Sequence, residues 1–191
     1  MRQVILQIDT TLDGFISGPN GEQDWVKADE EMNQDANALL STADTILLGR
    51  RAYQLFADFW PFADTNGSST ESKIAHKLNN ATKVVFSTTL EKVEWGNWNN
   101  ARLVRGNIAE EITEMKAQPG KNLVLYAGAE IVSTFVRLGL IDEYRLRVHS
   151  VVLGSGKPLF KDIKDRVNLN LVKTKAYQNG AVLLEYQLVR K

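Results

Sequence analysis

The stretch LVLYAGAEIVSTFVRLG, residues 123–139, shows the unit from which the fold is built. Residues 123–126 form a short apolar run typical of a buried strand. Apolar side chains then recur at helical spacing over 131–136, and Gly139 stands where a helix commonly ends in a left-handed residue. A strand followed at once by an amphipathic helix is the repeating unit of a parallel sheet.

Similar units surround this stretch on both sides. The patterns predict strands at 4–8, 45–48, 83–87 and 102–105, and helices around 32–40, 53–60, 74–78 and 108–116, with Pro61 ending the second helix. Residues 144–149 alternate apolar and polar side chains, as a half-buried strand does. Asn179-Gly180 predicts a type I′ hairpin between 169–178 and 181–189. We therefore expect one α/β domain over residues 1–191, with a central mostly parallel sheet, flanking helices and a C-terminal antiparallel hairpin.

Composition excludes several classes of function. Lys plus Arg and Asp plus Glu each total 23 in 191 residues, so the basic surplus of a phosphate-contacting nucleic-acid binder is missing. The chain has no cysteine and only two histidines, His76 and His149, which excludes thiolate-ligated metals and leaves little for a histidine site. Neither a signal peptide nor a membrane span is predicted, and we expect a soluble cytoplasmic protein without a metal.

Three strand exits carry the candidate binding residues, because ligands of α/β sheets bind where strands end and helix amides are unpaired. Gly49-Arg50-Arg51 would bind phosphate, or form a tight turn followed by solvated charge. Ser87 and Thr88 would bind phosphate or ribose, or cap the next turn. The small residues at 128–129 would let a pyrophosphate reach a helix N-terminus, although the dinucleotide fingerprint spacing is absent.

The segment from Asp9 to Trp25 is rich in glycine and predicts a long flexible loop, a candidate lid over a ligand. Asp13-Gly14 also fits a plain turn, and Trp25 fits either a stacking surface or the core. Residues 154–158 resemble a phosphate loop but lack its leading glycine and its hydroxyl residue, so we expect a turn there. His76 and His149 are interpreted as surface or strand residues.

In this order, the segments resemble the dihydrofolate-reductase-like superfamily over essentially the whole chain. The resemblance is greater to the reductase domain of the riboflavin-biosynthesis deaminase/reductase, and to its stand-alone bacterial relatives, than to folate reductases. The stretches that carry it are 11–16, Asp24-Trp25, 48–53, 86–88 and above all 139–143 through 151–160.

The resemblance implies NADPH as hydride donor, as in 5-amino-6-(5-phosphoribosylamino)uracil reductase, and a homodimer. Its cofactor-binding residues would be Gly49, Arg50, Arg51, Ser87, Thr88, Gly128, Ala129, Glu130 and Ile131. Asp13 and Trp25 would contact a small heterocyclic substrate. The proton would come from Asp13, Glu30 or water. A non-catalytic nucleotide-binding dimer and, less well supported, a phosphate-handling transferase are the alternatives.

Overall fold

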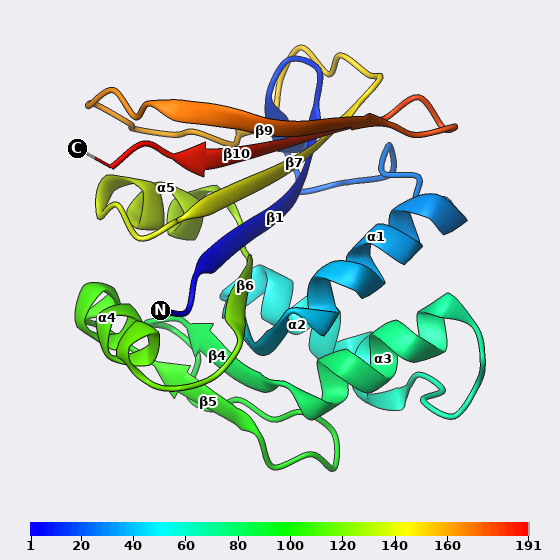
Figure 1. The fold of residues 1–191 in the computed structure, drawn as a ribbon, viewed down its shortest axis with the longest axis vertical. Helices are drawn as coiled ribbons and strands as arrows, with labels where there is room; N and C mark the ends of the chain where they lie inside the picture. The colour runs from blue at the N-terminus through cyan, green and yellow to red at the C-terminus, as the bar shows by residue number, and fades with distance from the viewer. Residues whose placement is uncertain (191) are drawn as a thin grey trace. The chain divides into compact units, whose positions relative to one another are not determined.

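The computed structural model describes residues 1–190, and the chain divides into two compact units (Figure 1). Unit 1 comprises residues 1–3 and 30–127, and unit 2 comprises residues 4–29 and 128–190. The two units are interleaved in the sequence, and a single domain over residues 1–191 stays a prediction. No helix within residues 1–190 has the length and apolarity needed to cross a membrane.

Unit 1 is built on parallel strands in the order β5-β4-β3-β6. The strands are β3 (Ala43–Gly49), β4 (Thr82–Phe86), β5 (Ala101–Val104) and β6 (Asn122–Tyr126). The side chains at 46–48, 84–86 and 123–125 are almost fully buried. Such continuous apolar runs suit strands covered on both faces.

The helices of unit 1 follow the predicted periodicity. They are α1 (Glu30–Ser41), α2 (Arg50–Phe59), α3 (Thr70–Asn80) and α4 (Ile108–Ala117), and α1 packs against α3. Ser69 caps α3 by accepting a hydrogen bond from the Ser72 amide at 3.1 Å. Helix α2 ends at Phe59, and Pro61 lies within the following 3-10 turn, η1 (Trp60–Phe62).

Unit 2 contains the first strand and the C-terminal part of the chain. Strand β1 (Val4–Thr11) pairs in parallel with β7 (Glu143–His149), and β10 (Val182–Leu188) and β9 (Leu169–Ala176) continue this order in antiparallel fashion. In Figure 1 the β9–β10 hairpin runs from orange to red. Helix α5 (Ala129–Arg137) is followed by Gly139, whose φ of 63° is left-handed, as predicted for a glycine just beyond a helix. The predicted fold class is thus confirmed.

Three local predictions are wrong, one of them in part. The segment from Asp9 to Trp25 is not one flexible loop: residues 9–11 belong to β1, and β2 (Phe15–Ser17) pairs with β8 (Lys157–Pro158), so part of the expected turn at 154–158 is also a strand. The hairpin turn is not type I′, because only Gly180 has a positive φ, at 87°, and Asn179 does not. The turn is longer than two residues: the Gly180 amide donates to the Tyr177 carbonyl, and the Tyr177 amide to the Ala181 carbonyl.

Candidate functional site

Two of the predicted strand exits lie next to each other in unit 1. Gly49 at the end of β3 is the register partner of Phe86 at the end of β4, so the residues that follow each strand are neighbours. Arg50 donates a hydrogen bond from Nη1 to the Thr89 hydroxyl at 2.9 Å. The Ser87 hydroxyl oxygen accepts from the Thr89 and Leu90 amides at 3.2 and 3.1 Å. Ser87 therefore caps its own turn, while Arg50 joins the two exits.

The N-terminus of α2 is open to an anion. Gly49 precedes the helix in an extended conformation, and no side chain caps the first amides. The first turn contains no acidic residue, and the side chains of Arg50 and Arg51 are exposed. Positive partial charge from the helix and two guanidinium groups thus occur at one place.

Helix α5 in unit 2 begins in the same way. Gly128 is extended and its helix has no side-chain cap. A Cβ added to Gly128 would meet no atom within 4 Å, so the backbone can be approached closely there. Glu130 lies in the first turn and its side chain is exposed. Ala129 and Ile131 are half-buried on either side of it.

Asp13, one of the two predicted proton donors, fastens a loop. Its carboxylate accepts hydrogen bonds from the Thr11 hydroxyl at 2.6 Å and from the amides of Leu153 and Gly154 at 3.3 and 2.8 Å. The hydrogen bond from Thr11 is the main reason that the pKa of Asp13 lies below its ordinary value. Asp13 is therefore ionised near neutral pH and positions the 153–154 segment.

Glu30, the other predicted donor, lies in unit 1 and is bonded there. The Thr70 hydroxyl donates to Glu30 Oε1 at 2.5 Å, and the Gln34 amide donates to the same oxygen at 3.2 Å. These hydrogen bonds, that of Thr70 foremost, lower the pKa of Glu30. Both carboxyl groups are thus held in the form that accepts a proton.

Sequence reasoning missed a polar cluster at the ends of β1 and β7 in unit 2. His149 Nε2 lies 2.8 Å from Asp9 Oδ1, and Arg147 Nη2 donates to Asp9 Oδ2 at 2.5 Å. Burial opposes the charge of Asp9, but its hydrogen bonds to His149 and Arg147 outweigh burial and keep its pKa below the ordinary value. The ring of Trp25 meets that of His149 edge-on, with 5.4 Å between their centroids.

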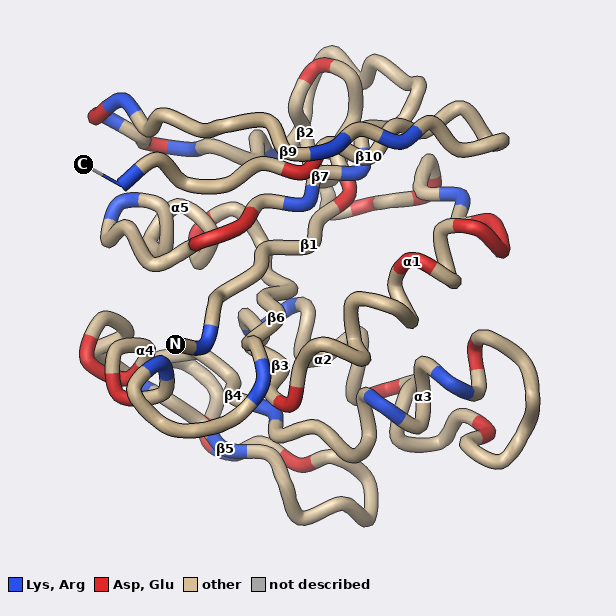
Figure 2. Tube along the Cα trace, in the orientation of Figure 1, with Lys and Arg blue, Asp and Glu red and all other residues tan. Residues whose placement is uncertain are grey.

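A second charged group lies on the same strands. Arg145 donates to the Gln7 side chain at 3.3 Å and forms ion pairs with Glu185 at 2.6 Å and with Glu143 at 3.7 Å. Burial is the main reason that the pKa of Glu143 is raised. Strand β7 carries Glu143, Arg145 and Arg147 and strand β10 carries Glu185, and Figure 2 shows both signs of charge on these two strands. The alternation of apolar and polar residues over 144–149 predicted strand β7, but it gave no information on which residues its charged side chains would contact.

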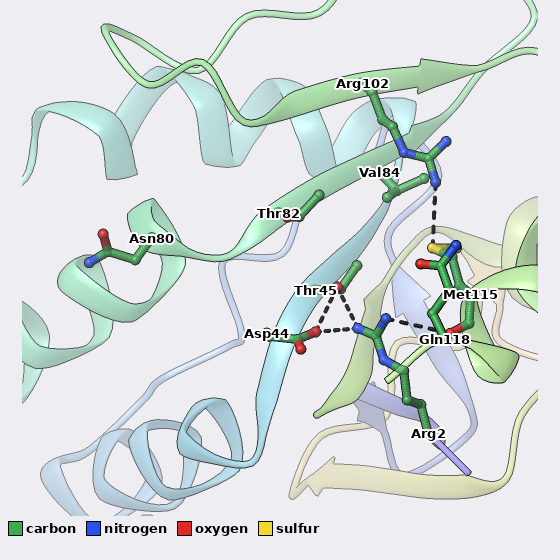
Figure 3. Close-up of a pocket in the computed structure, with 9 residues that line it drawn as sticks. All are labelled: Arg2, Asp44, Thr45, Asn80, Thr82, Val84, Arg102, Met115 and Gln118. Atoms are coloured by element: carbon green, nitrogen blue, oxygen red, sulfur yellow. Dashed lines mark hydrogen bonds and ion pairs between the residues drawn. The ribbon is translucent and has the colours of Figure 1, made fainter. Parts of the chain in front are cut away.

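A cavity of about 390 Å³ lies in unit 1 near the starts of β3, β4 and β5, away from the strand exits (Figure 3). Arg2 and Arg102 line it, and both are already paired: Arg2 with Asp44, and Arg102 with Glu111. Residues 1–190 contain no group of three metal-ligating side chains of the His, Cys, Asp or Glu type. The strand exits and the His149 cluster are therefore the better candidates.

Comparison with known proteins adds a family to this geometry. The profile of the RibD C-terminal domain matches residues 2–183. Two Bacillus subtilis proteins are similar along almost their whole length. YyaP is 41% identical over 185 residues, covering 97% of this chain and 94% of YyaP, and YwjB is 28% identical over 189 residues, covering 97% of each chain.

Solved structures show the same fold. A protein from Shewanella sp. PV-4, described as a riboflavin biosynthesis protein, superposes with a TM-score of 0.78 at 24% identity, and each chain is fully covered. The Thermotoga maritima diaminohydroxyphosphoribosylaminopyrimidine deaminase/5-amino-6-(5-phosphoribosylamino)uracil reductase gives a TM-score of 0.65 at 15% identity, with 98% of this chain but 57% of that chain covered.

Proposed function

This chain belongs to the RibD C-terminal domain family, and we propose that it is an NADPH-dependent reductase that transfers a hydride to a small heterocyclic substrate. The family points to a reductase-type activity. A pteridine or pyrimidinone is the substrate class we propose, because the Thermotoga maritima relative is named for a uracil derivative. A cytoplasmic location and a homodimer complete the proposal.

The observation that carries the choice of cofactor is the uncapped, doubly arginine-flanked start of α2 beside the turn after β4. NADPH differs from NADH by a 2′-phosphate, a dianion near neutral pH that requires fixed positive charge. Arg50 and Arg51 supply that charge, and the α2 amides supply donors.

The cofactor supplies the hydride when it is bound. In our proposal Gly49, Arg50 and Arg51 hold its phosphates, and Ser87 and Thr88 hold the adenosine side. Residues 128–131 are proposed to bind the pyrophosphate, which the open approach to Gly128 and the uncapped α5 support. Asp13 keeps the 153–154 segment in place, and Trp25 covers the substrate.

The experiment titrates Arg50→Ala and Arg51→Ala with NADPH and with NADH, followed by tryptophan fluorescence. A hydrogen bond to a charged group contributes about 1.5–3 kcal/mol. Loss of the responsible arginine therefore weakens NADPH roughly 10- to 100-fold and leaves NADH almost unchanged. Arg137→Ala, which removes another exposed arginine, at the end of α5, is the control. Equal weakening of both cofactors by both variants would refute this assignment.

The engaged carboxylates of Asp13 and Glu30 favour one alternative, a nucleotide-binding dimer without turnover. NADPH binding without oxidation at 340 nm, across dihydropterin, aminopyrimidinone and naphthoquinone probes, would support it.

A further inference from the structure

The cluster of Asp9, Arg147, His149 and Trp25 lies within unit 2 and has no part in the cofactor contacts above. His149 is 6% exposed, and the side chains of Asp9 and Arg147 are each 15% exposed. Burying charged and polar groups costs free energy unless each one is bonded. Burial of the cluster therefore destabilises the fold unless each polar group is hydrogen-bonded, so a buried group without a partner points to a ligand or a water.

Two buried donors in the cluster have no partner among residues 1–190. These are Trp25 Nε1 and Arg147 Nε. Both are N–H groups that cannot accept a hydrogen bond, so only an acceptor atom satisfies them. Unsatisfied buried groups in a native fold commonly mark a place that a ligand or an ordered water completes.

The ring of His149 is fixed from one side. An ionised carboxylate only accepts hydrogen bonds, so His149 Nε2 carries the proton in its contact with Asp9. Nδ1 forms no hydrogen bond within residues 1–190. The Trp25 edge packs against the ring and limits its rotation. A carboxylate that orients one ring nitrogen and leaves the other for substrate is the arrangement of a general acid–base histidine.

The proposed reductase needs a proton donor that the expected carboxylates do not provide. Asp13 and Glu30 accept hydrogen bonds as anions, whereas His149 bonds Asp9 through one ring nitrogen and has its other ring nitrogen unengaged within residues 1–190.

We propose that His149 is the catalytic acid of this protein: its Nδ1–H gives a proton to the substrate, and the two unpartnered N–H groups of the cluster, Trp25 Nε1 and Arg147 Nε, donate hydrogen bonds to a substrate oxygen. This inference rests on the proposed function. Bound NADPH would supply a hydride to the carbon of a C=N or C=O bond of the substrate, and the π electrons of that bond would pass to its heteroatom. That atom takes the proton from Nδ1, NADP⁺ is formed, and water reprotonates the imidazole.

Within residues 1–190, two charged side chains belong to the cluster around His149. Asp9 on β1 contacts it directly, and Arg147 on β7 contacts the same carboxylate. Trp25, on the segment before α1, brings no charge, and Lys27 and Asp29 follow it in the sequence. Asp13 is bonded to Thr11, Leu153 and Gly154 and not to the ring. Asp9 is therefore the positioning residue on which the acid depends.

The experiment compares His149→Gln with His76→Gln, which removes the other histidine, an exposed residue of α3. Steady-state oxidation of NADPH is followed at 340 nm from pH 5.5 to 9, with a dihydropterin and an aminopyrimidinone as probes. General acid catalysis contributes about 10²- to 10⁴-fold. We expect kcat of His149→Gln to fall by at least ~100-fold with little change in KM, and the shape of its kcat–pH profile to differ from that of the wild type. His76→Gln behaves as wild type.

A second readout does not depend on turnover. In ¹⁵N-histidine NMR of the protein without cofactor, we expect the neutral ring of His149 to carry its proton on Nε2, and Asp9→Asn to alter that tautomer. Because the chain has two histidines, the signals that remain in His76→Gln are those of His149. Adding the probe that the enzyme reduces should change the ¹⁵N chemical shift of His149 Nδ1 more than that of Nε2.

The possible failures are distinguishable. A wild type that neither binds nor oxidises NADPH refutes the proposed function together with the acid. A wild type that turns over, with His149→Gln retaining its kcat and pH profile, overturns the acid alone. If His149→Gln lowers both the NADPH affinity and the melting temperature, and Asp9→Asn leaves the His149 tautomer unchanged, His149 has a structural role. That result also overturns the proposal that His149 is the acid.

Discussion

Replacing Arg2 with methionine removes a guanidinium that ties the start of the chain to the edge of the unit 1 sheet. Arg2 Nε donates to the Lys121 carbonyl at 2.6 Å, and Nη2 donates to the Thr45 hydroxyl at 2.7 Å. The same group pairs with Asp44, and the Arg2 side chain is only 7% exposed (Figure 3). Methionine retains most of the side-chain length but provides no donor.

The size of the effect follows from these contacts. Breaking a buried ion pair costs about 3–5 kcal/mol, because one charge is left without a partner. The Asp44 side chain is 41% exposed, so water can solvate the carboxylate left without a partner and reduces that cost. We therefore expect the free energy of unfolding to fall by about 2–4 kcal/mol. For a chain of this length, that corresponds to a drop in Tm of roughly 4–16 °C.

Arg102→Met is the matched control, because Arg102 lines the same cavity and also pairs with an acid, Glu111. Its side chain is 45% exposed, and exposed pairs contribute about 0–1 kcal/mol. Urea unfolding of both variants, followed by tryptophan fluorescence and by circular dichroism, gives the comparison. Equal losses for the two arginines would refute the argument that the burial of Arg2 decides its contribution.

Two further predictions concern stability and assembly. Lys83 donates to the carbonyls of α3 and the turn after it (Leu78, Asn79, Ala81), and its burial lowers its pKa to about 7. Between pH 7 and 10 the folded protein binds fewer protons there than the unfolded chain, so stability rises with pH. Urea unfolding at pH 7 and 9 should show that the free energy of unfolding rises with pH in the wild type but not in Lys83→Met. The same rise in both proteins would contradict this prediction. The half-buried apolar pairs Leu146–Leu184 and Val148–Val182 support the proposed homodimer. Light scattering should give twice 21.4 kDa at micromolar concentration, and a mass of 21.4 kDa alone would exclude the dimer.

Local periodicity was sufficient for much of the fold. The apolar run at 123–126 and the helical spacing at 131–136 predicted β6 and α5, because both patterns depend on neighbours in the sequence. The pairing of Phe15 with Pro158 has no such local signal, and β2 and β8 were missed. The hairpin at Asn179 was predicted correctly, but its turn type was not. Strand β9 ends at Ala176 and β10 begins at Val182, so the connection is longer than the sequence pattern indicated.

The candidate site divides in the same way. The exits at Gly49 and Ser87 were predicted, because glycine and hydroxyl residues after apolar strands are visible in a linear sequence. The Asp9–His149 contact joins residues 140 positions apart, and it depends on the parallel register that sets Thr11 opposite His149. Composition and spacing carry no information about that register.

The pairing of β1 with β7 has a consequence for how the protein is made. Strand β1 is synthesised well before β7, so the parallel ladder between them cannot be complete before residue 149 has been synthesised. At ribosomal rates of about 5–20 residues per second, this delay is on the order of ten seconds. During that time the buried apolar residues Ile5 and Leu6 lack the β7 partners that they have in the folded protein. Nascent chains stalled before residue 143 should therefore be bound by chaperones at their N-terminal end.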